Sequence, residues 1–183
     1  MIRLESENLS IRKTCFDDLK HFAEWETWES VIAFFSIAAG KTFEETVRES
    51  VLWDQDHSKR QFTICLREEN LPIGRVYLSK VDPDTDSLDI TRIYIADKNY
   101  RGKGFGEEAM KLLLKYCFEE MKCERVTLDH YTGHKVASSL YLKLGFKYEG
   151  IARRACKKSG EYFDVELMSM LKAEYVEKYS QKF

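Results

Sequence analysis

Residues 101–106 read Arg-Gly-Lys-Gly-Phe-Gly and place three glycines within five positions, in a chain of 183 residues that has nine glycines in all. The stretch follows a segment rich in β-branched and aromatic residues, 88–96, and opens a segment, 104–121, whose apolar residues recur at helical spacing. Glycines lack Cβ and let backbone N–H groups approach a ligand, and the free N–H groups of a helix start favour an anion. The stretch therefore predicts a phosphate-binding turn between a strand and a helix, with a glycine-rich connection that binds nothing as the alternative.

Two familiar phosphate-binding patterns do not explain the glycines. The P-loop pattern, two glycines five positions apart followed by Lys and Ser or Thr, does not occur in the chain, and Glu107 stands where a dinucleotide-binding fingerprint needs its third glycine. Both interpretations are excluded, so the surroundings of the stretch have to identify its ligand.

Charge is divided unevenly along the chain. The net charge of −2 combines −7 in residues 1–91 with +5 in residues 92–183. A nucleic-acid-binding domain would show a basic excess, so we expect no nucleic-acid partner. The acidic and basic halves favour one cationic and one anionic small ligand. The alternative is that charged residues on solvent-exposed surfaces are unevenly distributed between the halves by chance.

Composition predicts a globular protein inside the cell. Hydrophobic residues make up 44% of the chain, enough for one sizeable core, and we expect a single domain over residues 1–183. Five cysteines without C-x-x-C spacing indicate neither a disulfide framework nor a metal site. The N-terminus does not resemble a signal peptide, and the apolar run 31–39 is too short to span a bilayer, which predicts a cytoplasmic protein without a membrane partner.

Periodicity predicts strands that alternate with helices in the second half of the chain. The expected fold class is α+β, a mixed α/β arrangement. Thr42 with Glu45 three positions later predicts a helix start, and Gly145 predicts a helix end. The expected strands lie near 9–11, 61–67, 73–81, 88–96, 125–129, 148–152 and 162–171, and the expected helices near 17–25, 42–54, 104–121 and 135–144.

Two motifs in order resemble a known family. Arg101-x-x-Gly104-x-Gly106 is similar to the [RQ]-x-x-G-x-[GA] motif of the GNAT (Gcn5-related) N-acetyltransferases, and residues 140–146, Leu-Tyr-Leu-Lys-Leu-Gly-Phe, resemble the signature that follows it about forty residues later. Residues 9–12 and 160–164 resemble the RimJ/RimL-like branch. The resemblance implies a GNAT-like, mostly antiparallel, six- to seven-stranded mixed sheet flanked by helices. It also implies acetyl-CoA as co-substrate and a primary amine acceptor, such as a protein N-terminus, a polyamine or another small amine, that attacks the thioester directly in a ternary complex.

The resemblance assigns roles to individual residues. Tyr141 matches the general acid, and Asp129, twelve positions earlier, matches the general base, with His130, Asp89 and Glu161 as alternatives. His134 stands where the family usually has Asn. The residues expected to bind the cofactor are Ile93, Tyr94, Ile95, Arg101, Gly102, Lys103, Gly104, Phe105, Gly106, His134 and Ser138.

The sequence does not determine which amine accepts the acetyl group, and it allows a second function. Carboxylates at 82–89 and 44–49 would attract a cationic acceptor, although charged turns are more often only solvated. The aromatic side chains of Trp25, Trp28, Phe34 and Phe35 would line an acceptor pocket or fill the core. A CoA-binding regulatory module without turnover is the competing hypothesis, and a homodimer is possible.

Overall fold

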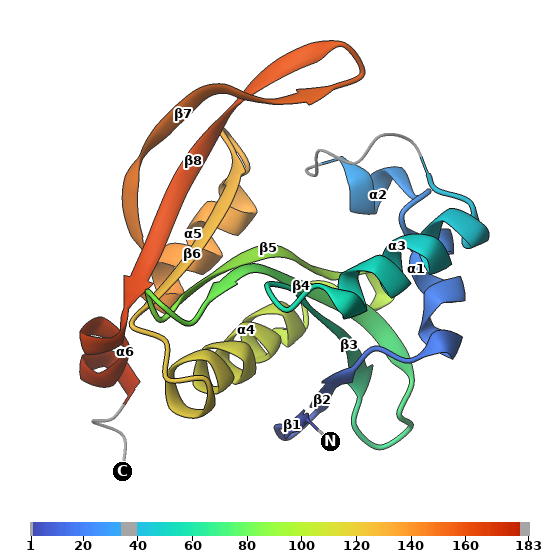
Figure 1. Cartoon of the computed structure of the whole chain (residues 1–183), viewed down its shortest axis with the longest axis horizontal. Helices are drawn as coiled ribbons and strands as arrows, with labels where there is room; N and C mark the ends of the chain where they lie inside the picture. The colour runs from blue at the N-terminus through green and yellow to red at the C-terminus, as the bar shows by residue number, and fades with distance from the viewer. Residues whose placement is uncertain (1, 34–39, 180–183) are drawn as a thin grey trace.

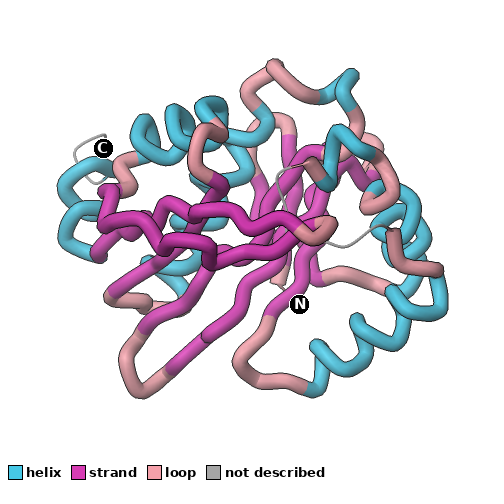
Figure 2. The backbone as a smooth tube through the Cα atoms, turned by 90° about the horizontal axis from the view of Figure 1, so that it is seen from above, coloured by secondary structure: helices cyan, strands magenta, loops and turns pink. Residues whose placement is uncertain are grey.

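The computed structural model describes residues 2–33 and 40–179. Their strands form one mixed sheet with helices on either side of it (Figures 1 and 2). The order across the sheet is β1-β2-β3-β4-β5-β6-β8-β7, and every neighbouring pair is antiparallel except β5 and β6. The strands are β1 (Arg3–Glu5), β2 (Leu9–Lys13), β3 (Arg60–Leu66), β4 (Pro72–Asp82), β5 (Ser87–Ile95), β6 (Arg125–Tyr131), β7 (Lys147–Lys158) and β8 (Glu161–Leu171).

The helices begin and end largely where the sequence chemistry predicts. The expected capping box is present, because Glu45 N–H donates to Thr42 Oγ1 at 3.2 Å and Thr42 N–H donates to Glu45 Oε2 at 2.8 Å. Gly145 ends its helix in the left-handed conformation at φ +102°. The helices are α1 (Leu19–Trp25), α2 (Glu29–Ile32), α3 (Phe43–Gln55), α4 (Phe105–Lys115), α5 (Lys135–Leu144) and α6 (Lys172–Tyr179).

Strands β5 and β6 separate soon after they pair. Their parallel pairing covers three residue pairs, from Ser87 with Arg125 to Asp89 with Thr127. Beyond that point β5 continues beside β4, and β6 continues beside β8, so the two strands diverge (Figure 1). The sheet therefore opens between residues 90–95 and 128–131.

The main core lies between the sheet and α4. Alternate residues of the central strands, such as Leu88, Ile90 and Leu128, are buried against one face of α4. A second, smaller cluster packs α1 on the opposite face of the sheet, where Phe22 and Trp25 meet Tyr94. Trp25 is therefore a core residue, whereas Phe34 and Phe35 lie outside the described residues.

Three differences separate the structure from the expected elements. The sheet has eight strands rather than six or seven, because the short β1 adds an edge. The helix expected over 104–121 is α-helical to Lys115 and continues as one π-helical turn over residues 116–120. The strand expected at 148–152 extends to Lys158 and forms a long hairpin with β8.

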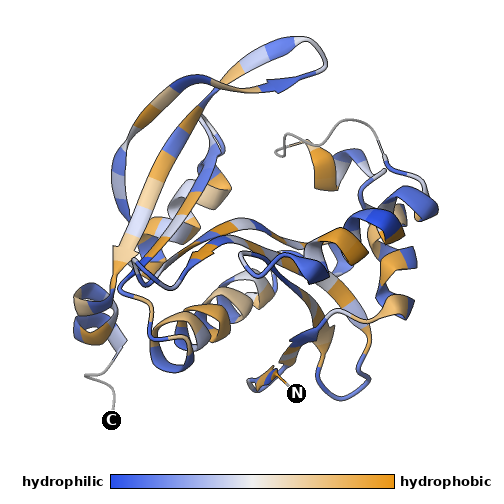
Figure 3. Ribbon diagram, viewed as in Figure 1, coloured by the Kyte–Doolittle hydropathy of each residue, from blue (hydrophilic) through white to orange (hydrophobic). Residues whose placement is uncertain are grey.

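This hairpin reaches back across the molecule to α2. It extends beyond the body of the sheet and bends toward α2 in Figure 1, and polar and apolar residues alternate along it in Figure 3. Lys158 Nζ near its tip donates to the carbonyl oxygens of Ile32 at 2.6 Å and Ala33 at 3.3 Å. The hairpin is thus tied to the end of α2.

Within residues 2–33 and 40–179, no helix is both long enough and apolar enough to cross a lipid bilayer.

Candidate functional site

A cavity of about 380 Å³ lies beside the last residues of β5, where β5 has separated from β6. Residues of β5, the glycine-rich turn, α4, α5 and α2 surround it, and most of them are apolar. This volume and lining are typical of a small-molecule site. The lining residues are Ser30, Val31, Ile93, Tyr94, Ile95, Arg101, Gly102, Gly106, Met110, His134, Val136, Ala137, Leu140 and Tyr141.

The glycine-rich turn exposes its backbone at the edge of the cavity. Gly102 and Gly104 have φ values of +73° and +85°, and a Cβ built on either would meet no atom within 4 Å. Gly104 is the N-cap of α4, so the N–H groups of the first turn that follows have no partner within the helix. The turn therefore offers unobstructed backbone donors to an anionic group.

Two carboxylates in the first turn of α4 are held by other groups. Glu107 is ion-paired with Lys111 and Lys143, and Glu108 accepts hydrogen bonds from Ser6 and Asn8 at the β1–β2 turn. The contacts with Lys111 and Lys143 lower the pKa of Glu107. The charge of Glu107 is thus balanced by two lysines, and the Glu108 carboxylate is held by neutral donors at the β1–β2 turn.

Arg101 supports the turn through its own backbone contacts. Its guanidinium donates to the carbonyl oxygens of Ile95 at 2.8 Å and Ala96 at 2.7 Å, and to Ser30 at 3.0 Å. Three backbone carbonyl groups therefore hold the side chain of Arg101, the residue that the motif predicts to contact the cofactor. Arg101 ties the end of β5 to the glycine-rich turn and to α2 while it lines the cavity.

Tyr141 faces the cavity from α5. Burial, followed by the negative charge of Asp129, raises the pKa of Tyr141 to about 12. The phenol consequently keeps its proton at neutral pH and is able to donate it.

Two carboxylates lie where β5 and β6 part. Asp89 is buried and accepts from Thr91 Oγ1 and Thr127 Oγ1, both at 2.8 Å. Asp129 is exposed and lies two residues after Thr127, on the same face of β6. The surrounding groups remove water from the Asp129 carboxylate, and this raises its pKa. The negative charge of Asp89 raises it further. Asp129 therefore binds a proton more readily than an ordinary Asp.

The neighbouring histidines occupy different layers. His134 lines the cavity and precedes the first residue of α5, and burial, with His130 as a second cause, lowers its pKa. His130 is buried and faces away from Asp129, as the alternation of a strand predicts.

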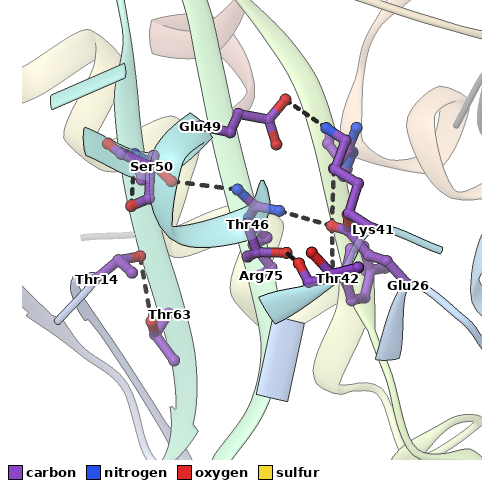
Figure 4. A network of polar contacts seen from close by, with 12 residues as sticks. Thr14, Glu26, Lys41, Thr42, Thr46, Glu49, Ser50, Thr63 and Arg75 are labelled. Atoms are coloured by element: carbon purple, nitrogen blue, oxygen red, sulfur yellow. Dashed lines mark hydrogen bonds and ion pairs between the residues drawn. The ribbon is translucent and has the colours of Figure 1, made fainter. Parts of the chain in front are cut away.

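A buried polar network supports the site from the opposite face of the sheet (Figure 4). Glu26 Oε1 accepts from Arg75 at 2.6 Å, from Arg92 at 2.8 Å and from the Tyr94 hydroxyl at 3.2 Å. Burial opposes the charge of Glu26, but Arg92 and Arg75 outweigh it, so the pKa of Glu26 is lowered. Sequence reasoning missed this network, because Glu26 and Arg75 are separated by 49 positions and no local pattern joins them.

The structure brings together most of the residues that the sequence singled out. Ile93, Tyr94, Ile95, Arg101, Gly102, Gly106, His134 and Tyr141 all line the cavity. Lys103, Gly104 and Phe105 lie in the chain between the lining residues Gly102 and Gly106, and Ser138 follows Ala137, but none of these four lines the cavity. Asp129 and Asp89 lie at the parting of the strands, and Glu161 lies at the tip of the hairpin, where it pairs with Lys158.

Known proteins share sequence and fold with this chain. Residues 8–147 match the family model described as an acetyltransferase (GNAT) domain. An uncharacterized N-acetyltransferase, p20, from Bacillus licheniformis is 25% identical over 96% of the chain and 99% of its own length. A spermine/spermidine N(1)-acetyltransferase from Bacillus subtilis is 33% identical over 45% of the chain and 46% of its own length.

A solved structure shares the fold over most of the chain. The crystal structure of spermidine N-acetyltransferase from Vibrio cholerae, in complex with CoA and spermine, superposes with a TM-score of 0.86. It is 22% identical, and the alignment covers 93% of the present chain and 99% of that one.

Proposed function

The chain belongs to the GNAT acetyltransferase family, enzymes that take the acetyl group from acetyl-CoA, and we propose from this premise that it transfers the group to a primary amine. One observation carries the proposal: the cavity beside β5 joins an open glycine-rich turn to the protonated hydroxyl of Tyr141. A phosphate-binding turn, an apolar passage and a proton donor are together what an acyl-CoA thioester requires.

The residues present fit acetyl-CoA. Gly102 and Gly104 leave space for a pyrophosphate beside the start of α4, because a Cβ at either position would meet no atom within 4 Å. The apolar wall formed by Val136, Leu140 and Met110 suits an uncharged arm. We propose that Ile93, Tyr94 and Ile95 present their backbone groups to the acyl end of the ligand.

Tyr141 and Asp129 are proposed to move the protons. An amine attacks the thioester carbon only in its neutral form, and the thiolate of CoA needs a proton as it leaves. Tyr141, whose pKa is raised to about 12, donates that proton. Asp129, whose pKa is raised above that of an ordinary Asp, accepts a proton from the amine, directly or through water.

A polyamine is the first acceptor to test. The carboxylates of Asp89 and Asp129 lie beside the opening of the sheet and favour a cation there. Relatives that share part of the sequence or the fold are described as spermine or spermidine acetyltransferases. We further propose that residues 1–183 act as one cytoplasmic domain of the RimJ/RimL-like branch.

Release of free CoA from acetyl-CoA in the presence of amines tests the function. Spermine, spermidine, an N-terminal peptide and an aliphatic monoamine form the panel, and the proposal expects CoA release above the rate without acceptor for at least one of them. No release with any of the four would contradict it.

Tyr141→Phe separates an enzyme from a binding module of the same fold. The phenyl ring keeps the shape of the cavity but carries no proton, so we expect kcat to fall about 100-fold or more. Acetyl-CoA affinity, measured by calorimetry, stays within about twofold of the wild-type value. An unchanged kcat would remove Tyr141 from the chemistry.

A further inference from the structure

The short helix α2 forms part of the wall of the cavity. Its residues Ser30 and Val31 line the cavity together with Arg101 and Gly102 of the glycine-rich turn. α2 has only four residues, and a helix of that length is not stable by itself in water. The wall at Ser30 and Val31 therefore depends on contacts that hold α2 from outside.

Two cationic side chains hold the carbonyl end of α2. Arg101 donates to the carbonyl oxygen of Ser30 at 3.0 Å. Lys158 Nζ donates to the carbonyl oxygens of Ile32 at 2.6 Å and Ala33 at 3.3 Å. The last four carbonyl groups of an α-helix have no N–H partner within the helix, and a positive charge is favourable at that end. Arg101 and Lys158 thus stabilise the end of α2 from two separate elements.

The turn of the β7–β8 hairpin places Lys158 at this end of α2. Lys158 and Glu161 form the last pair of the hairpin, and Ser159 and Gly160 connect them. The φ values of Ser159 and Gly160 are +50° and +87°, and a type I′ turn requires positive φ at both of these positions. Such a turn matches the twist of the two strands, so it fixes Lys158 at the tip, where the hairpin bends toward α2 (Figure 1).

The neighbouring lysine has a different environment. Successive side chains of a strand point to opposite faces, so Lys157 and Lys158 leave the hairpin on different sides. Lys157 is exposed, and its Nζ lies 5.2 Å from the ring centroid of Tyr162. Lys158 is half-buried, and both of its hydrogen bonds go to α2. The two lysines place the same charge at the tip, but Lys158 is the one that holds α2.

We propose that Lys158 is a positioning residue for the acetyl-CoA site, because it holds α2 where Ser30 and Val31 complete the wall of the cavity. This inference rests on the proposed function. Lys158 does not line the cavity itself, so it acts through the position of α2 and not on the reacting atoms. Its loss therefore weakens ligand binding and leaves the chemical step intact.

Replacement of Lys158 by residues with and without donors tests this role. Lys158→Met keeps a long side chain but has no N–H group, and we expect the Kd of acetyl-CoA, measured by calorimetry, to rise about tenfold. Lys158→Arg retains several N–H donors and should bind acetyl-CoA within about twofold of the wild-type Kd. At saturating substrate, kcat of both variants should stay within about twofold of wild type. An unchanged Kd in Lys158→Met, or a loss confined to kcat, would overturn the proposal.

Lys157→Met is the matched control for charge. It removes one positive charge from the same hairpin tip and leaves the two hydrogen bonds to α2 in place. We expect the Kd of acetyl-CoA to change less than about twofold. An equal rise in Kd for Lys157→Met and Lys158→Met would show that the charge of the tip attracts the anionic ligand, and it would contradict a specific role for Lys158.

Amide hydrogen exchange in the free protein tests the hold on α2 without any ligand. The N–H groups of Ile32 and Ala33 donate to the carbonyl oxygens of Trp28 at 3.0 Å and Glu29 at 2.9 Å. Both should exchange about tenfold faster in Lys158→Met than in wild type or Lys157→Met. Equal exchange rates in all three proteins would overturn the proposal. If wild type binds no acetyl-CoA, the proposed function fails, whereas the exchange rates still decide whether Lys158 holds α2.

Discussion

At the scale of single residues, the two carboxylates at the parting of β5 and β6 differ in what they contact. Asp89 receives hydrogen bonds from two threonine hydroxyls, whereas Asp129 is exposed and its pKa is raised. A raised pKa means that the ionised form of Asp129 is disfavoured in the folded protein. The ionised Asp129 side chain therefore lowers the stability of the folded protein.

Asp129→Asn is therefore expected to have opposite effects on stability and activity. The free energy of unfolding at pH 7, measured in urea, should rise, because an unfavourable charge is removed. This gain should vanish as the pH falls below about 3.8, the ordinary pKa of Asp, where the wild-type residue is protonated in both states. Acetylation should fall about 100-fold if the residue is the base.

Asp82→Asn is the matched control. Hydrogen bonds from Thr85 and Asp84 lower the pKa of Asp82, so its charge is favoured in the folded state. This variant should lose stability at pH 7 and keep its activity. A loss of stability in Asp129→Asn as well would contradict the assignment of Asp129.

The sequence predicted those residues of the site that belong to a short sequence motif. The glycine-rich turn and Tyr141 belong to short patterns, and both line the cavity or its edge. The orientation of Arg101 was not predictable in full, because one of its three carbonyl partners, Ser30 of α2, lies 71 positions away. Glu26 and Arg75 were missed for the same reason.

At the scale of elements, β4 and β5 approach closely beside the cavity. A Cβ on Gly74 would lie 2.2 Å from the carbonyl oxygen of Tyr94. Only glycine permits this spacing, because no backbone oxygen can tolerate such a contact. Gly74 therefore fixes the position of the β5 backbone that is proposed to meet the acyl group.

Gly74→Ala is expected to displace the carbonyl of Tyr94 and weaken acetyl-CoA binding about tenfold, measured by calorimetry. Ile73→Val, on the same strand, is the control, because it costs about 0.5–1.5 kcal/mol of stability without touching that carbonyl. Similar affinities for the two variants would show that the close approach does not matter for the ligand.

Periodicity predicted the long elements better than the short ones. The helices α3 and α5 and the strands β3 to β6 lie close to their expected ranges. The short β1 and α2 have too few residues to show a period, and α6 follows β8 without an intervening turn. The length of β7 comes from its pairing with β8, a contact between segments that a local pattern does not contain.

At the scale of the whole molecule, the Glu26 network joins α1 to the sheet. Arg75 is 1% exposed, and its guanidinium also lies 4.5 Å from the centroid of Phe22. Removal of the single carboxylate would leave Arg75 and Arg92 without their shared partner. Breaking a buried ion pair in this way costs about 3–5 kcal/mol.

Glu26→Gln should lower the free energy of unfolding by about that amount at pH 7. The pKa of Glu26 is lowered by folding, so its contribution is present above about 4.5, its ordinary value, and is lost as the pH falls further. Urea denaturation at pH 7 and pH 3 should therefore show a difference from wild type that shrinks in acid. Glu24→Gln, exposed on α1 two positions before Glu26, should cost little at either pH, and a constant difference for Glu26→Gln would contradict the ion-pair explanation.

The position of α4 in the chain has a consequence for synthesis on the ribosome. A nascent chain that has emerged as far as Ile95 already contains β1 to β5, which pair in order as neighbours. The apolar face of those strands stays uncovered until residues 105–115 emerge and bring Ala109, Met110 and Leu113 onto it. Translation therefore passes through a stage in which the apolar face of β1 to β5 is exposed to solvent. A nascent chain of that length is the form that a molecular chaperone would bind.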